Sequence, residues 1–196
     1  MKKLVALTGK TGAGKSTISE YLSRKGAYII DGDVVAREVL SIDETLISKL
    51  CEAFGDILNE DGSLNRKKLA AKAFSSAENT CKLNSIMHPA INSVISRRAE
   101  KAFESHNVVV VDAAAIIESG FAAVCDCIVV VHAPFEVRKS RIISRDGLSE
   151  YDALIRLNGQ KDDEFYLSKA DFIINNFEPY ELKDEIASLE KELFDF

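Results

Sequence analysis

A glycine-rich segment near the amino terminus constrains the fold of this chain more than any other feature. Residues 9–17 read Gly-Lys-Thr-Gly-Ala-Gly-Lys-Ser-Thr and fit the pattern G-x-x-x-x-G-K-[ST]. An apolar run at 4–8 precedes the segment, and helical patterning at 15–25 follows it. A strand, a phosphate-binding loop and a helix in this order predict that the chain binds ATP or GTP. A glycine-rich turn that only caps a helix would leave Lys15 and Ser16 unexplained.

The chemistry of phosphate binding accounts for the residue types in this loop. Glycine lets the backbone curl until successive N–H groups face the phosphates, and the helix amino terminus adds partial positive charge. Lys15 is expected to neutralise the β- and γ-phosphates, and the Ser16 hydroxyl to hold Mg²⁺. The residues expected to bind the nucleotide here are Gly12, Ala13, Gly14, Lys15, Ser16 and Thr17.

Short apolar runs rich in β-branched residues alternate with helical patterning along the chain. Runs that are hydrophobic throughout are typical of parallel strands covered on both faces, so the sequence predicts an α/β fold. The region 41–106 contains no strand candidate, and we interpret it as a helical insertion. Strands are expected at 4–8, 27–30, 108–111, 128–131 and 172–174, and helices at 15–25, 34–54, 66–105, 135–145, 149–168 and 180–194.

Composition and charge exclude several classes of partner. The 196 residues carry a formal net charge of −6, which argues against a broad nucleic-acid-binding face. No run approaches the roughly 20 apolar residues that span a bilayer, so no membrane partner is expected. The four cysteines lack zinc-like spacing and are expected to be reduced thiols. We therefore expect a cytoplasmic protein, either a monomer or a weak homo-oligomer.

Three carboxylates follow predicted strands, where ligands bind in open α/β sheets. Asp33 could accept the proton of an attacking hydroxyl, or it could cap a helix that starts at Val34. Asp112 ends a wholly apolar strand and could order a Mg²⁺ shell, directly or through water, or cap the strand end. Glu118 lies six residues further on and could contact the acceptor or have no role.

Two helical segments leave further alternatives open. Arg141 and Arg145 are four residues apart on a helix that also carries Arg138, and they form either a phosphate-stabilising lid or a solvated basic face. The carboxyl-terminal stretch has one apolar face, which we expect to dock on the sheet rather than to form a dimer seam. The residues of that face are Leu182, Ile186, Leu189 and Leu193.

Taken together, the motifs resemble the dephospho-CoA kinase family of P-loop kinases. The similarity extends over nearly the whole chain, through LTGKTGAGKST, IDGDVVAREVL, FGDILNEDGSLNRKKLAAKAF, LNSIMHPAI, VVVVDAAAIIESG, CDCIVVVHA, RIISRDGLS, the segment from Arg156 to Gln160, and ADFIINN. The resemblance implies a three-layer α/β/α fold with a five-stranded parallel sheet. It implies a core at about 1–40 and 107–196, a helical coenzyme-binding insertion at about 41–106, and a short lid at about 138–150.

The resemblance also implies an activity and residue roles. Members transfer the γ-phosphate of ATP to the ribose 3′-hydroxyl of dephospho-CoA, with Mg²⁺ as cofactor. Asp33 matches the family's proposed base, and Arg141 and Arg145 match the lid. The other matching positions are Arg37, Arg66 and His88 in or near the acceptor pocket and Asn176 beside the adenine. Without the family, Arg66 reads as a surface helix residue, and Pro89 beside His88 as a helix-starting proline.

Some positions depart from the family pattern. Lys10 and Thr11 stand where the family usually has glycine and isoleucine, and Ala113–Ala115 replace a more bulky, proline-containing run. Glu178 stands near the adenine loop where glycine is common. A kinase for another small acceptor, such as a nucleoside monophosphate, is the alternative. A regulatory GTPase is disfavoured because no N/T-K-x-D segment that would read guanine is found late in the chain.

Overall fold

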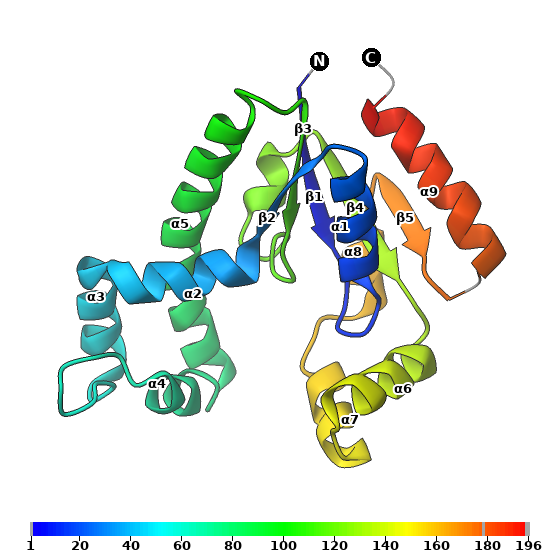
Figure 1. Cartoon of the computed structure of the whole chain (residues 1–196). Helices are drawn as coiled ribbons and strands as arrows, with labels where there is room; N and C mark the ends of the chain where they lie inside the picture. The colour runs from blue at the N-terminus through cyan, green and yellow to red at the C-terminus, as the bar shows by residue number, and fades with distance from the viewer. Residues whose placement is uncertain (1, 178, 195–196) are drawn as a thin grey trace. The chain divides into compact units, whose positions relative to one another are not determined.

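The computed structural model describes residues 2–177 and 179–194, in two compact units (Figure 1). The first unit comprises Met1–Asp31 and Ala99–Phe196, and the second comprises Gly32–Arg98. The second unit begins where the second strand ends and includes most of the predicted helical insertion. Glu178, one of the departures from the family pattern, lies outside the described residues.

A five-stranded parallel sheet forms the centre of the first unit, in the order β2-β3-β1-β4-β5. The predicted α/β fold is therefore confirmed. Alternating strand residues such as Val5 and Val110 join one core cluster, and their neighbours Ala6 and Val109 are also fully buried. Both faces of the sheet are covered, which explains the uninterrupted apolar runs. The strands are β1 (Lys3–Thr8), β2 (Tyr28–Asp31), β3 (Val108–Asp112), β4 (Cys127–His132) and β5 (Phe172–Asn175).

Helices α1 (Lys15–Arg24) and α9 (Pro179–Phe194) pack against the core cluster of the sheet. Leu189 and Leu193 of α9 are fully buried there, and Leu182 and Ile186 pack partly buried against the same cluster. The docking predicted for the carboxyl-terminal helix is confirmed. The rest of this unit holds η1 (Phe121–Val124), α6 (Phe135–Asp146), α7 (Glu150–Asn158) and α8 (Asp163–Leu167).

The second unit consists of helices and a short turn. An isolated antiparallel bridge joins Leu58 to Leu64, and no named strand occurs within this unit, all of whose residues are described. Its helices are α2 (Gly32–Ile42), α3 (Glu44–Phe54), α4 (Arg66–Ala73) and most of α5 (Ala77–Ala102).

Three predicted helices are each divided in two. The stretch 34–54 breaks at Asp43, whose side chain caps α3 by accepting a hydrogen bond from the Leu46 N–H at 2.9 Å. The stretch 66–105 breaks before α5, and 149–168 breaks after Gly159. Apolar residues continue at helical spacing across these breaks, so the spacing alone predicted one helix where capping residues such as Asp43 and Asp162 start a second one.

The position of Pro89 differs from the one predicted from the sequence. It lies inside α5, and the interpretation that it starts a helix is therefore wrong. Proline lacks an N–H and removes one bond from the helical ladder, yet the helix continues to Ala102.

All four cysteines are free thiols. Cys127 is buried in the sheet, and burial raises the pKa of Cys125 and of Cys127 to about 12. A search of the described residues finds no helix that is both long and apolar enough to cross a membrane.

Candidate nucleotide site and acceptor groove

The phosphate loop joins β1 to α1 as the motif predicts. Gly14 sits at the N-cap of α1 with φ of 97°, in the left-handed region that favours glycine. An added Cβ there would lie 2.0 Å from Asn176 Nδ2. Lys15 begins the helix and is half-buried, while Ser16 and Thr17 are exposed at its amino terminus. Free N–H groups at a helix start favour an anion, so the loop is built to hold phosphate.

Close packing fixes the first glycine of the loop. An added Cβ at Gly9 would lie 2.3 Å from the carbonyl oxygen of Val131 in β4, at a φ of 150°. Because that atom belongs to the backbone of a central strand, it has little freedom to retreat. Gly26 also has positive φ, at 99°, but an added Cβ there would meet no atom within 4 Å.

We expect Gly9→Ala to lower the free energy of unfolding by about 2–4 kcal/mol, since it adds a steric clash to an unfavourable backbone conformation. Gly26→Ala is the matched control, and its cost of about 1–2 kcal/mol comes from the backbone alone. Urea denaturation of both variants measures the difference. Equal destabilisation of the two would contradict the contact with Val131 as the reason for glycine at position 9.

Arg141 holds the loop from the side of α6. Its Nη1 donates to the carbonyl oxygens of Gly12 and Ala13, both at 3.3 Å, and its Nη2 donates to that of Asn176 at 2.7 Å. Asn176 Nδ2 in turn donates to the Ala13 carbonyl at 2.8 Å. The side chains of Arg141, predicted for the lid, and of Asn176, predicted to lie beside the adenine, thus both bind backbone carbonyls of the phosphate loop.

Arg145 lies one turn further along α6 and is exposed. It makes a two-pronged contact with Asp146, at 2.7 and 2.9 Å, and Arg156 donates to the same carboxylate at 2.7 Å. The hydrogen bond between Arg145 and Asp146 shifts both groups: it raises the pKa of Arg145 and lowers the pKa of Asp146. Gly147 ends α6 in the left-handed conformation. Both arginines line one groove of about 570 Å³, whose other lining residues include Gly12, Gly14, Ser16, Thr17 and Asn176.

The predicted carboxylates after β3 lie in the same unit. Asp112 ends β3 in register with Leu7 of β1 and with Asp31 of β2, at the edge where β1 leads into the phosphate loop. Glu118 is half-buried, and its Oε1 accepts a hydrogen bond from the Tyr166 hydroxyl at 2.8 Å. Asp112 is therefore placed at the nucleotide edge of the sheet, and Glu118 is held by α8.

Asp33 lies in the first turn of α2, in the second unit. The helix begins at Gly32, so the alternative in which Asp33 caps a helix starting at Val34 is wrong. Its side chain is exposed, and Arg37 is exposed four residues later on the same helical face. The Asp33 carboxylate is thus open to a ligand instead of being engaged as a cap.

A groove of about 490 Å³ brings Arg37 and Arg66 together within the second unit. Nη2 of Arg66 donates to the Arg37 carbonyl oxygen and to Ser41 Oγ, both at 3.0 Å. Arg98, which no sequence motif indicated, also lines the groove and forms an ion pair with Glu38. No local pattern marked that pair, because its members are 60 residues apart. His88 is half-buried on α5.

Comparison with known proteins identifies the family. The family model described as dephospho-CoA kinase matches residues 3–180. The chain belongs to the dephospho-CoA kinase family. It is an ATP-dependent phosphotransferase with the activity of that family.

Individual relatives agree with this assignment. The dephospho-CoA kinase of Corynebacterium efficiens is 42% identical over 179 residues, which are 90% of each chain. Among solved structures, protein TT1252 from Thermus thermophilus has a TM-score of 0.81 at 26% identity, over 98% of each chain. The dephospho-CoA kinase of Campylobacter jejuni has a TM-score of 0.62 at 26% identity, over 100% of this chain and 99% of that one.

Proposed function

We propose that this kinase transfers the γ-phosphoryl group of ATP to the ribose 3′-hydroxyl of dephospho-CoA, with Asp33 as the general base. The observation that carries the proposal is the exposed Asp33 carboxylate, one residue into a helix that begins directly after β2. The 3′ oxygen forms a bond to the γ-phosphorus, and the bond from that phosphorus to the β–γ bridging oxygen breaks. The hydroxyl proton passes to Asp33, and ADP leaves.

Charge stabilisation falls to the nucleotide groove. Lys15 neutralises the transferring phosphoryl group, assisted by Arg141 and Arg145. Arg141 contributes by holding the Gly12 and Ala13 carbonyls, which orients the loop, as well as by its own charge. Phosphoryl transfer asks little covalent chemistry of a protein, so positioning and electrostatics supply most of the acceleration. The main chain of the loop, Thr17 and Asn176 complete the ATP contacts.

The residues present fit a Mg²⁺ ion that arrives with ATP. Mg²⁺ keeps several waters and binds through one or two protein oxygens plus phosphates, rather than in a dedicated protein cage. The Ser16 hydroxyl and the Asp112 carboxylate are such oxygens, and no cluster of three or more His, Cys, Asp or Glu that could hold a metal occurs in the described part of the chain. When bound, the ion would offset charge on the β- and γ-phosphates.

The acceptor is assigned to the groove of the second unit. Arg37 and Arg66 supply positive charge for the phosphates of dephospho-CoA, and Val34 and Ile42 supply apolar surface. His88 and Glu118 are proposed as further acceptor contacts. In this proposal the helical insertion at about 41–106 binds the coenzyme, and the segment 138–150 serves as the lid of the core. We further propose that the kinase acts in the cytoplasm as a monomer or weak homo-oligomer, and its four free thiols fit a reducing compartment.

Product analysis tests the regiochemistry. Incubation with ATP, Mg²⁺ and dephospho-CoA should give one phosphorylated product, whose new phosphorus couples in the NMR spectrum to the ribose 3′ proton. Phosphate on the 2′ oxygen, or on the pantetheine end, would contradict the proposed placement of the acceptor against Asp33.

A further inference from the structure

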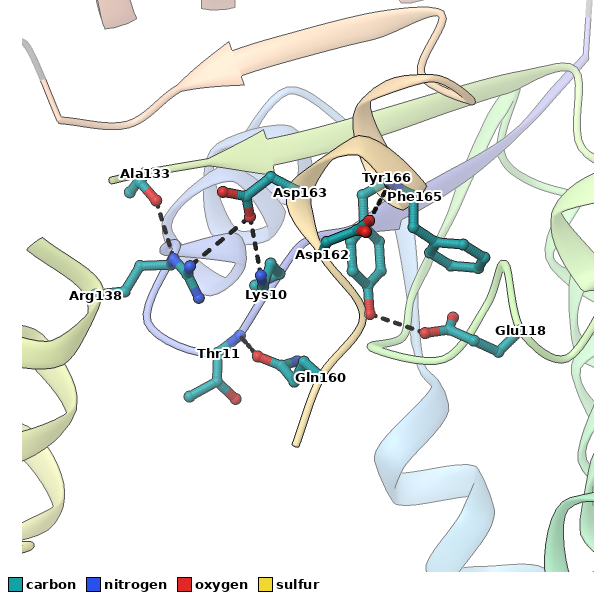
Figure 2. Close-up of polar contacts among 10 residues, drawn as sticks. All are labelled: Lys10, Thr11, Glu118, Ala133, Arg138, Gln160, Asp162, Asp163, Phe165 and Tyr166. Atoms are coloured by element: carbon teal, nitrogen blue, oxygen red, sulfur yellow. Dashed lines mark hydrogen bonds and ion pairs between the residues drawn. The ribbon is translucent and has the colours of Figure 1, made fainter. Parts of the chain in front are cut away.

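The segment from Gln160 to α8 contacts the phosphate loop at two positions that the phosphate-binding pattern leaves variable. Gln160 Oε1 accepts a hydrogen bond from the Thr11 N–H at 2.9 Å. Asp163 Oδ1 lies 3.0 Å from Lys10 Nζ. Figure 2 shows both side chains directed at the loop, with the Lys10 ammonium turned toward α8. Lys10 and Thr11, the two departures in the loop, are therefore both held by one segment.

Asp163 balances a second, buried cation. This cation is Arg138 of α6, which is only 1% exposed. Its Nε donates to the Ala133 carbonyl oxygen at 3.0 Å, and its Nη2 lies 3.7 Å from Asp163 Oδ1. Burial lowers the pKa of Arg138. Burial acts to raise the pKa of Asp163, but the ion pair with Lys10 and the charge of Arg138 outweigh it and hold that pKa low. Two cations behind the loop thus share one carboxylate.

Tyr166 anchors α8 on its other side. It lies three residues after Asp163, on the same helical face, and is 3% exposed. Its hydroxyl donates to Glu118 Oε1 at 2.8 Å, and burial together with this hydrogen bond raises the pKa of Tyr166 (Figure 2). Because α8 is fixed at Glu118, it offers the phosphate loop a rigid support.

We propose that Gln160 and Asp163 are positioning residues, which hold the phosphate loop in its ATP-binding shape through Thr11 and Lys10. A loop binds phosphate well only if its N–H groups already face the anion, since ordering them at the moment of binding costs affinity. Lys10 contributes through its pair with Asp163 rather than by touching the nucleotide. This proposal rests on one part of the proposed function, the binding of ATP by the phosphate loop. It can therefore be tested in the absence of dephospho-CoA.

The test is the affinity for Mg-ATP, measured by isothermal titration calorimetry in the absence of dephospho-CoA. Asp163→Asn is expected to raise the dissociation constant about fivefold, the scale of coupling between contacting groups. Asp162→Asn is the matched control. It removes the same charge one residue earlier, where the side chain caps α8 by accepting from the Phe165 N–H at 2.8 Å, and asparagine caps equally well. Its affinity should stay within about twofold of wild type.

A double-mutant cycle separates positioning from direct contact. Lys10→Met is expected to weaken ATP binding about fivefold, and the double variant about fivefold as well, since both changes break one pair. Removal of Lys10 should also restore part of the thermal stability that Asp163→Asn loses, because it relieves repulsion from Arg138. If Lys10→Met weakens ATP binding while Asp163→Asn does not, or if the two effects multiply, the proposal is overturned.

Gln160→Met keeps the proposal testable if Asp163→Asn does not fold. This variant leaves every charge in place and removes only the acceptor for the Thr11 N–H. It should raise the ATP dissociation constant and the KM for ATP about threefold, with kcat at saturating ATP nearly unchanged. Wild-type ATP affinity in Gln160→Met would contradict the proposal. Because the dissociation constant is measured with ATP alone, failure of the kinase to turn over dephospho-CoA would leave that readout interpretable.

Discussion

Replacing Lys15 by methionine should lower kcat by about 10²–10³-fold, the scale measured when one preorganised donor to a transition-state anion is removed. Methionine keeps most of the side chain's length and loses the charge. Lys15 is half-buried at the first position of α1, where the helix amino terminus also favours anions. Initial rates of ADP formation at saturating substrates measure the effect.

Lys25→Met is the control for this variant. Lys25 is the C-cap residue of the same helix, at the end opposite the phosphate loop, and its ammonium pairs with Glu190 at 2.8 Å. The charge change is identical, and kcat should remain within about twofold of wild type, because an exposed ion pair contributes little. A loss of less than tenfold in Lys15→Met would contradict the role assigned to Lys15.

Asp33→Asn should lower turnover by about 10²-fold or more, the scale of losing a general base. Asparagine preserves the size of the side chain and cannot take the proton from the attacking hydroxyl. The affinity for ATP should not change, since Asp33 is assigned to the acceptor. Single-turnover phosphorylation of dephospho-CoA and calorimetric titration with ATP separate the two quantities.

Asp43→Asn provides the comparison for Asp33. Asp43 lies in the same unit, and its role as the cap of α3 is one that asparagine also fills. This variant should match wild type in both stability and turnover. If Asp33→Asn also turns over within a factor of a few of wild type, Asp33 is not the base.

Local patterns predicted the parts of the molecule that depend on local sequence. Each of the five apolar runs predicted one strand, and the three inner strands β1, β3 and β4 owe their uninterrupted apolar sequence to burial on both faces. The phosphate loop was predicted because its glycines and Lys15 are contiguous. The breaks at Asp43 and after Gly159 were missed, since capping there competes with apolar spacing that runs on across both sites.

Contacts between distant segments could not be read from the sequence. Arg138 belongs to a run of arginines that resembles a solvated basic face, yet it is buried. Thr11 and Gln160 are 149 positions apart, and only the folded chain brings them together. Lys10 and Thr11 stood out as departures and Gln160 as the end of a family-like segment, but no sequence pattern linked the two regions. Arg141 was predicted as a lid residue, and its bonds to loop carbonyls emerged only from the structure.

Acceptor selectivity distinguishes a dephospho-CoA kinase from a kinase for another small acceptor. The measurement is Mg-ATP-dependent ADP release with dephospho-CoA, beside AMP, CMP, dTMP and adenosine at equal concentrations. We expect dephospho-CoA to be turned over with a kcat/KM at least about 10²-fold above that of any rival, since the arginine-lined groove of the second unit is proposed as its binding site. Turnover of a nucleoside monophosphate with dephospho-CoA left unchanged would contradict the assignment of the acceptor, while leaving the phosphate loop and its support in place.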